Sequence, residues 1–135
     1  RAGVTVLENE AAVRGPVTVA GIGDDFSHHD DIAATMRAAR ATGRPIVVLT
    51  HSPDLAPALP RDAAVVLAGH THCGQAYLFA RRLSPQVSRR GDRYLCGVKR
   101  EAGRTVVVTA GLGTSGAPFR LGAPPDLWLL TLRAP

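Results

Sequence analysis

The stretch AAVVLAGHTHCGQ, residues 63–75, joins an apolar strand to a pair of histidines. Its first six residues are all apolar, which is typical of a strand that is buried on both faces of a sheet. His70 and His72 follow directly after this strand, and Gly69 and Gly74 allow the backbone to bend tightly around them. Because side chains alternate along an extended chain, we expect the two imidazoles to project to the same side.

A second apolar run ends in the same way. Residues 46–49, IVVL, are predicted to form another buried strand, and His51 follows it closely. Ligand sites of open α/β sheets lie beyond the carboxyl ends of the strands, so His51, His70 and His72 are predicted to meet at one edge of the sheet. Neutral imidazole is a common ligand of divalent metals. The three histidines therefore form a candidate metal site; the alternative is that each is an ordinary surface or hydrogen-bonding histidine.

The remaining pattern is that of a layered α/β protein. Apolar residues recur at helical spacing within residues 30–42, where Asp30 and Asp31 favour the start of a helix and Gly43 and Pro45 mark its end. Further strands are expected at 4–7, 17–20, 75–79, 94–99, 105–110 and 127–132, with a short helix at most at 54–59 and a loop at 111–125. The alternation of strands and helices predicts one α/β domain.

Composition and charge limit the classes of function. The chain has 135 residues, 45% of them hydrophobic, which is enough for a single domain with one core. Its formal net charge of +5 favours anionic partners such as phosphorylated substrates, acidic lipid headgroups or nucleic acid. Only 4% of the residues are aromatic, so nucleic acid has the least support. Five arginines follow the histidine motif: Arg81, Arg82, Arg89, Arg90 and Arg93. They could contact a phosphate or an anionic membrane surface; the alternative is that they are ordinary solvated charges.

Cys73 and Cys96 are too few for a disulfide framework and belong to no C-x-x-C zinc motif, so reduced thiols are expected. Cys73 lies inside the histidine loop, where a small residue is needed. Thr71 and Gln75 are expected to hold this loop in place through hydrogen bonds.

Two motifs together indicate a family. Residues 50–54, THSPD, followed by residues 68–75, AGHTHCGQ, resemble the last two metal-binding motifs of the calcineurin-like metallophosphoesterases. With the downstream segment GLGTSGAPFRLGAPP, residues 111–125, they are similar to one bacterial branch that includes membrane-associated phosphoesterases and UDP-diacylglucosamine pyrophosphohydrolase-like enzymes. The resemblance runs from residue 4 to residue 132.

The resemblance implies a fold and an activity. The fold is a four-layer αββα sandwich with mixed sheets, of which residues 1–135 would be the C-terminal portion of a single domain. His51 and His70 would bind one divalent ion and His72 a second, with Mn, Zn, Fe or Mg as the metals. Two such ions hydrolyse phosphate esters or pyrophosphates with water as the nucleophile. The implied substrates are phosphorylated small molecules or lipid-linked phosphates, in the bacterial cytoplasm or at an anionic membrane surface.

Three upstream motifs of the family, Asp-x-His, Gly-Asp-x-x-Asp and Gly-Asn-His-Asp/Glu, do not occur in the sequence. Residues 23–27, GDDFS, begin like the second motif but end in serine, so Asp24 is not assigned as a bridging ligand. The only methionine is the internal Met36. We therefore expect the C-terminal half of a phosphoesterase, which lacks the general acid and is inactive alone.

Half of a sandwich leaves sheet surfaces uncovered, so self-association is also expected. The alternative interpretation of the whole chain is a basic, non-catalytic binding or scaffolding module with an incomplete metal site.

Overall fold

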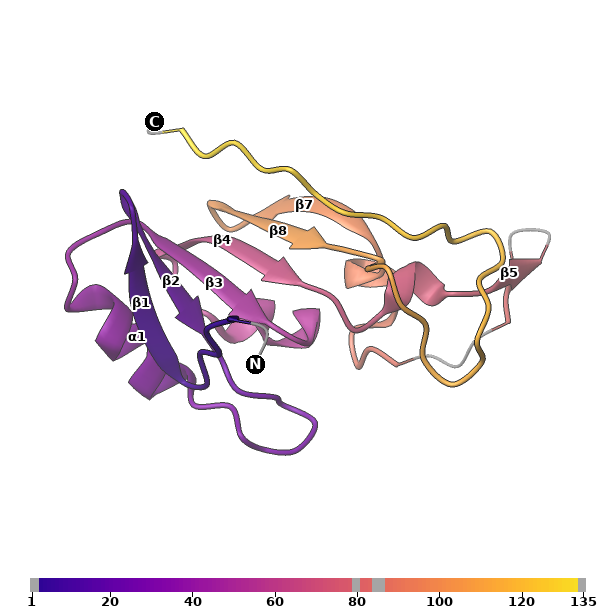
Figure 1. The fold of residues 1–135 in the computed structure, drawn as a ribbon, viewed down its shortest axis with the longest axis horizontal. Coiled ribbons are helices and arrows are strands. Elements are labelled where there is room, and N and C mark those ends of the chain that lie inside the picture. The colour runs from indigo at the N-terminus through magenta and orange to yellow at the C-terminus, as the bar shows by residue number, and fades with distance from the viewer. Residues whose placement is uncertain (1–2, 79–80, 84–86, 134–135) are drawn as a thin grey trace.

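A mixed sheet of six strands forms the centre of the molecule (Figure 1). The computed structural model describes residues 3–78, 81–83 and 87–133. In spatial order the strands are β1 (Glu10–Arg14), β2 (Val17–Gly21), β3 (Ile46–Thr50), β4 (Ala63–Ala68), β8 (Arg104–Val108) and β7 (Gly97–Glu101). The four inner strands run parallel to one another, whereas β1 and β7 are antiparallel edge strands. The α/β class predicted from the sequence is confirmed.

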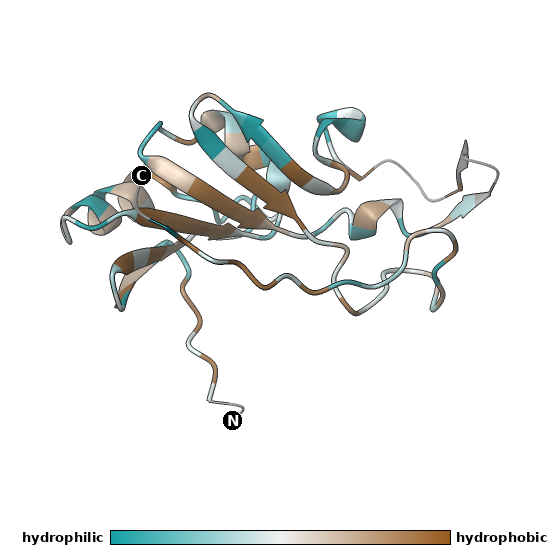
Figure 2. Cartoon of the chain, turned by 90° about the horizontal axis from the view of Figure 1, so that it is seen from above, coloured by the Kyte–Doolittle hydropathy of each residue, from teal (hydrophilic) through white to brown (hydrophobic). Residues whose placement is uncertain are grey.

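The apolar strands predicted from the sequence occupy the middle of this sheet. Val48 of β3 pairs with Val66 of β4, which pairs in turn with Val106 of β8, and all three side chains are fully buried. Figure 2 shows the hydrophobic residues gathered on these central strands. The prediction that these runs are buried on both faces is wrong, because Leu49 of β3 is 38% exposed and Ala64 of β4 is exposed. The runs nevertheless form inner strands of the sheet, as expected of short apolar segments.

One face of the sheet is covered by helix α1 (Ile32–Arg40). Thr35, Met36 and Ala39 are its buried residues, and Met36 is only 1% exposed. The predicted helix at 30–42 is thus confirmed, but it is shorter at both ends. Asp31 is the N-cap, so the helix begins at Ile32 rather than at residue 30.

Three short 3-10 helices also occur in the described residues: η1 (Pro53–Ala58), η2 (His72–Gly74) and η3 (Gly91–Tyr94). The first of them confirms the short helix that was predicted between the two apolar strands. It packs against β4 and β8, and Arg104 at the start of β8 donates to the carbonyls of Ala56 and Leu59.

Some predicted strands are displaced. No strand forms at 4–7; β1 lies at Glu10–Arg14 because a turn at residues 15 and 16 pairs Arg14 with Val17. The strand expected at 75–79 is reduced to β5 (Tyr77–Leu78), which pairs with β6 (Arg81–Arg82), and residue 79 lies outside the described residues. The strand expected at 94–99 begins only at Gly97, because Tyr94 ends a 3-10 helix.

The strand predicted at 127–132 is wrong. This segment is extended but unpaired, and it runs along one side of the sheet (Figures 1 and 2). Trp128 and Leu130 line a groove together with Leu49 and Leu67 of β3 and β4. Because the segment covers side chains on a face of the sheet, its backbone has no strand edge with which to form a ladder. Among the described residues, no helix is both long and apolar enough to cross a lipid bilayer.

Candidate metal centre

The carboxyl ends of β3 and β4 bring His51 and His70 together. Thr50 pairs with Ala68 at the last position of the two parallel strands, and the Gly69 amide then donates to the His51 carbonyl at 3.1 Å. The two chains therefore leave the sheet side by side. The edge placement that the sequence predicted for these histidines follows from this parallel register.

The two imidazoles are in direct contact. His51 Nε2 lies 3.0 Å from His70 Nδ1, and the rings meet edge to face with centroids 4.8 Å apart. Two nitrogens that bind one ion at about 2.0–2.1 Å are separated by about 3.0 Å in octahedral and about 3.3 Å in tetrahedral geometry. The observed separation thus fits two ligands of a common divalent ion, and the nitrogen donors match the chemistry that such ions prefer.

His72 lines the same cavity. This cavity of about 490 Å³ has His51, His70 and His72 in its wall, together with Ser115 and Phe119 of the loop 111–125, here called the Gly/Pro-rich loop. All three histidines that the sequence singled out therefore line one cavity, in which His51 and His70 are in direct contact.

The backbone of the histidine loop differs from the extended one expected. His70, His72 and Cys73 have φ angles of 66°, 49° and 52°, and Gln75 has 49°. Left-handed backbone is disfavoured for residues other than glycine and persists only where surrounding contacts hold it. The imidazoles reach the cavity through this compact turn and not through strand alternation, so that part of the prediction is wrong.

Hydrogen bonds from Thr71 and Gln75 hold the turn, as predicted. The Thr71 hydroxyl donates to the Leu95 carbonyl at 2.8 Å. The Gln75 amide nitrogen donates to the carbonyls of Ser115 and Ala117 at 2.9 and 3.0 Å, and its oxygen accepts from the Ser115 amide at 2.8 Å. The histidine turn is thereby tied to two distant segments of the chain.

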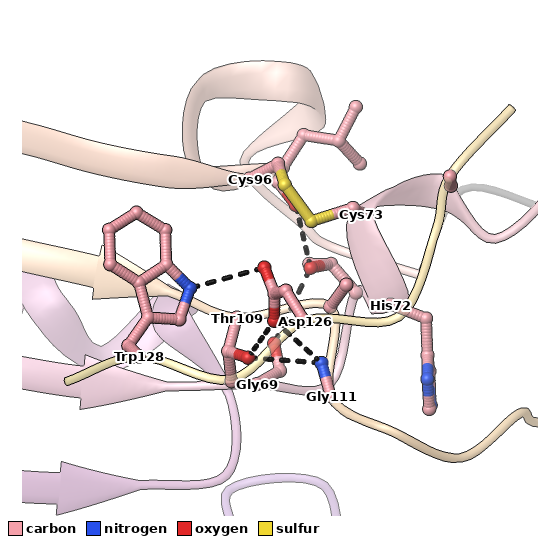
Figure 3. Close-up of a disulfide and its surroundings, with 12 residues drawn as sticks. Gly69, His72, Cys73, Cys96, Thr109, Gly111, Asp126 and Trp128 are labelled. Atoms are coloured by element: carbon pink, nitrogen blue, oxygen red, sulfur yellow. Dashed lines mark hydrogen bonds between the residues drawn. A yellow bond between two sulfur atoms is a disulfide. The ribbon is translucent and has the colours of Figure 1, made fainter.

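A disulfide between Cys73 and Cys96 makes a third tie (Figure 3). The expectation of reduced thiols is wrong, because the fold places these residues, 23 apart in sequence, with their Cα atoms 4.7 Å apart. The Asp126 carboxylate lies close to both sulfurs. Since each sulfur is bonded to the other, neither is available to a metal as a thiolate. Figure 3 also shows that His72 points away from the disulfide.

Arg120, which the sequence analysis missed, braces the turn from the Gly/Pro-rich loop. Its guanidinium donates to the His72 carbonyl at 3.1 Å and to the carbonyls of Ala110, Gly113 and Ala123. It also lies 3.3 Å from His72 Nδ1. Because a guanidinium can only donate, Nδ1 is the acceptor in that contact. A metal ion on His72 would therefore require this contact to rearrange.

Buried carboxylates also lie next to the site, although nothing in the sequence indicated their partners. The side chains of Asp25 and Asp54 are 2% and 1% exposed; Asp25 pairs with Arg89, and Asp54 pairs with both Ser88 and Arg89. Asp24 accepts hydrogen bonds from the amide and hydroxyl of Ser27, so it organises the turn after β2. Only a three-dimensional structure reveals these roles, because the partners are more than 30 residues away for Asp25 and Asp54.

The arginines after the histidine motif have mixed surroundings. Arg89 pairs with Asp25 and Asp54, and Arg93 pairs with Glu101 at 2.6 Å. Arg90 is exposed. The side chains of Arg81 and Arg82 lie outside the described part of the structure. Arg89 and Arg93 therefore form ion pairs within the chain.

Electrostatics favour a neutral His51. Partial burial lowers the pKa of His51, and the neighbouring His70 lowers it further, while the carboxylates of Asp24 and Asp25 oppose the shift. The neutral imidazole is the form that binds a metal.

Comparison with known proteins connects this geometry to a family. The chain is 30% identical over 136 residues to an uncharacterized metallophosphoesterase of Helicobacter pylori, an alignment that covers 96% of this chain and 35% of that protein. An uncharacterized metallophosphoesterase of Aquifex aeolicus is 28% identical over 142 residues, which cover 98% of this chain and 52% of that protein. A transmembrane protein with metallophosphoesterase domain from Danio rerio is 31% identical over 113 residues, 78% of this chain and 24% of that protein.

The chain thus spans about a third to a half of the length of these bacterial relatives. No family profile and no solved structure matches it. The names of the relatives do not favour the alternative of a non-catalytic scaffolding module. Since the similarity extends over nearly the whole chain and recurs among several relatives of that name, the chain belongs to a metallophosphoesterase family.

Proposed function

We propose that this chain contributes His51, His70 and His72 to a dinuclear metal centre that hydrolyses phosphate esters or pyrophosphates. The observation that carries the proposal is the 3.0 Å separation of His51 Nε2 and His70 Nδ1 at adjacent strand ends. That separation and those donors suit a shared divalent ion. The relatives named metallophosphoesterases supply the reaction class.

Each residue has a distinct part in this proposal. His51 and His70 hold one ion and His72 holds the other, while Arg120 restrains the His72 backbone. Bound divalent ions activate a water nucleophile and neutralise the phosphoryl charge. Imidazole donors suit zinc and iron better than magnesium, and manganese remains within the proposed set.

The cavity supports a phosphorylated substrate with an apolar portion. Leu83, Val87 and Phe119 line it beside the histidines. We propose a phosphorylated small molecule or a lipid-linked phosphate, for which the net charge of +5 also provides attraction to an anionic membrane surface. Residues outside this chain would supply the carboxylate and asparagine ligands, so the chain by itself is expected to be inactive.

Hydrolysis of bis(p-nitrophenyl) phosphate with Mn²⁺ tests the proposal. The assay uses the longest encoded protein that contains this chain. His70→Ala should lower the rate by more than about 100-fold, since even the outer-shell partners of a metal ligand typically account for about 10–100-fold. His28→Ala is the matched control, because His28 is exposed and does not line the cavity. Full activity of the His70→Ala protein, or none in the unaltered protein, would contradict the assignment.

A further inference from the structure

We propose that Asp54 is a positioning residue that sets the tautomer of His70 through the backbone of residues 87–89. The inference rests on the proposed function, because it concerns the same metal site. Asp54 belongs to the tetrapeptide that begins at His51. One short segment of sequence would therefore supply one histidine directly and orient the other indirectly.

Asp54 acts as a two-point clamp. It is the second residue of η1, and its side chain is 1% exposed. One carboxylate oxygen accepts from the Ser88 hydroxyl at 2.6 Å, and the other accepts from the Arg89 amide at 2.6 Å. A buried carboxylate is costly unless it is hydrogen-bonded, and here both oxygens are directed at successive residues of one segment. The backbone of residues 88 and 89 is therefore held in one place.

Asp25 strengthens this clamp from the other side. The Arg89 guanidinium donates to the Asp25 carboxylate, which is almost completely buried. The same guanidinium lies above the ring of Phe26, and that ring contacts the His70 ring with centroids 4.6 Å apart. The segments that follow β2 and β3 thus converge on Arg89, two residues after Val87.

The Val87 carbonyl carries the effect to His70. Its oxygen lies 3.3 Å from His70 Nε2. A carbonyl can only accept, so the His70 proton resides on Nε2 in this contact. Neutral His70 then has its lone pair on Nδ1, the atom that faces His51 Nε2 at 3.0 Å. A hydrogen bond to the far nitrogen is the usual means by which proteins orient a histidine ligand.

The test is nitrogen NMR of the imidazoles in the metal-free chain at a pH of about 8, above the ordinary histidine pKa of about 6.5. The unaltered chain should show His70 as a single tautomer with the proton on Nε2. In Asp54→Asn, the amide group cannot accept from the Arg89 amide and the Ser88 hydroxyl at once in the same way. His70 should then become a mixture of tautomers, and its Co²⁺ affinity should fall about 10–100-fold.

Asp62→Asn is the matched control. Asp62 is an exposed aspartate that also pairs with an arginine, Arg40, far along the sheet from the histidines. The Asp62→Asn variant should leave both the His70 tautomer and Co²⁺ binding unchanged. If Asp54→Asn fails to fold, Ser88→Ala removes one of the two clamp bonds and should shift the tautomer ratio in the same direction.

Two results would overturn the inference. One is that both Asp54→Asn and Ser88→Ala retain the single Nε2-protonated tautomer while folded; the other is that the unaltered chain carries the proton on Nδ1. Because the NMR measurement needs neither metal nor turnover, it is separate from the hydrolysis assay. A protein without phosphoesterase activity that still shows the tautomer change would refute the proposed function and leave this inference intact.

Discussion

Burial and neighbouring charges act on the pKa of His51 in opposite directions. Burial and the adjacent His70 disfavour the imidazolium, and the carboxylates of Asp24 and Asp25 favour it. The net effect is a pKa below the ordinary 6.5. A histidine kept neutral near neutral pH is ready to bind a divalent ion without first losing a proton.

This shift predicts how stability depends on pH. In the unfolded chain His51 takes up a proton near pH 6.5, whereas in the folded chain it does so only at lower pH. Between the two pKa values the unfolded state binds more protons, so the free energy of unfolding falls as the pH drops below about 6.5. The contribution of His51 to the free energy of unfolding is complete above its pKa in the unfolded chain. It is lost as the pH falls through the pKa of His51 in the folded chain.

Urea unfolding of the metal-free chain between pH 8 and pH 5 measures the effect. His51→Gln should lose less stability than the unaltered chain across this range. His28→Gln, which replaces an exposed histidine, should behave like the unaltered chain. Equal losses in the His51→Gln and unaltered proteins would show that His51 does not carry a lowered pKa.

Among the elements, helix α1 depends on a single capping residue. The Asp31 side chain accepts from the Ala34 amide at 2.8 Å, which satisfies one of the free amides at the helix start. Asp31→Ala should therefore lower the free energy of unfolding by about 1 kcal/mol. Denaturant titration followed by circular dichroism provides the measurement.

Asp30, the residue before the N-cap Asp31, provides a matched control for this variant. It precedes the N-cap and makes no capping hydrogen bond in the described structure. Asp30→Ala should change stability much less than Asp31→Ala. If the two variants lose the same stability, the cap contributes nothing specific and the local charge accounts for the change.

Patterns in the sequence predicted the inner elements better than the outer ones. β3, β4 and α1 were predicted because burial imposes a continuous apolar run or a helical repeat on the residues themselves. β1 and the segment 127–132 were misplaced, since an edge strand is selected by its turn and its partner, and neither leaves a strong local pattern.

For the molecule as a whole, the disulfide is a covalent constraint on the site. It closes a loop with a sequence separation of 23, and that loop contains the clamped residues Ser88 and Arg89. Closure of a loop of this length restricts the unfolded chain by about 3 kcal/mol in the chain-entropy account. Reduction should therefore destabilise the fold and release the histidine turn from one of its ties.

Thermal unfolding with and without dithiothreitol tests this constraint. The reductant should lower the melting temperature of the unaltered chain. It should have no effect on the Cys73→Ala/Cys96→Ala double variant, which should itself melt at the lower temperature. A melting temperature that is the same in all four measurements would show that the disulfide does not stabilise the chain.

Local sequence was sufficient for the central strands and for the arrival of three histidines at one sheet edge. Short apolar runs favour strands inside a sheet, and residues that follow neighbouring parallel strands emerge at the same edge. Only the tertiary structure decided which distant groups contact the histidine loop. Cys96 bonds to Cys73, Arg120 donates to the His72 carbonyl, and Asp54 binds the segment that contacts His70. Those contacts depend on the paths of loops through space, and no short pattern of residues encodes such a path.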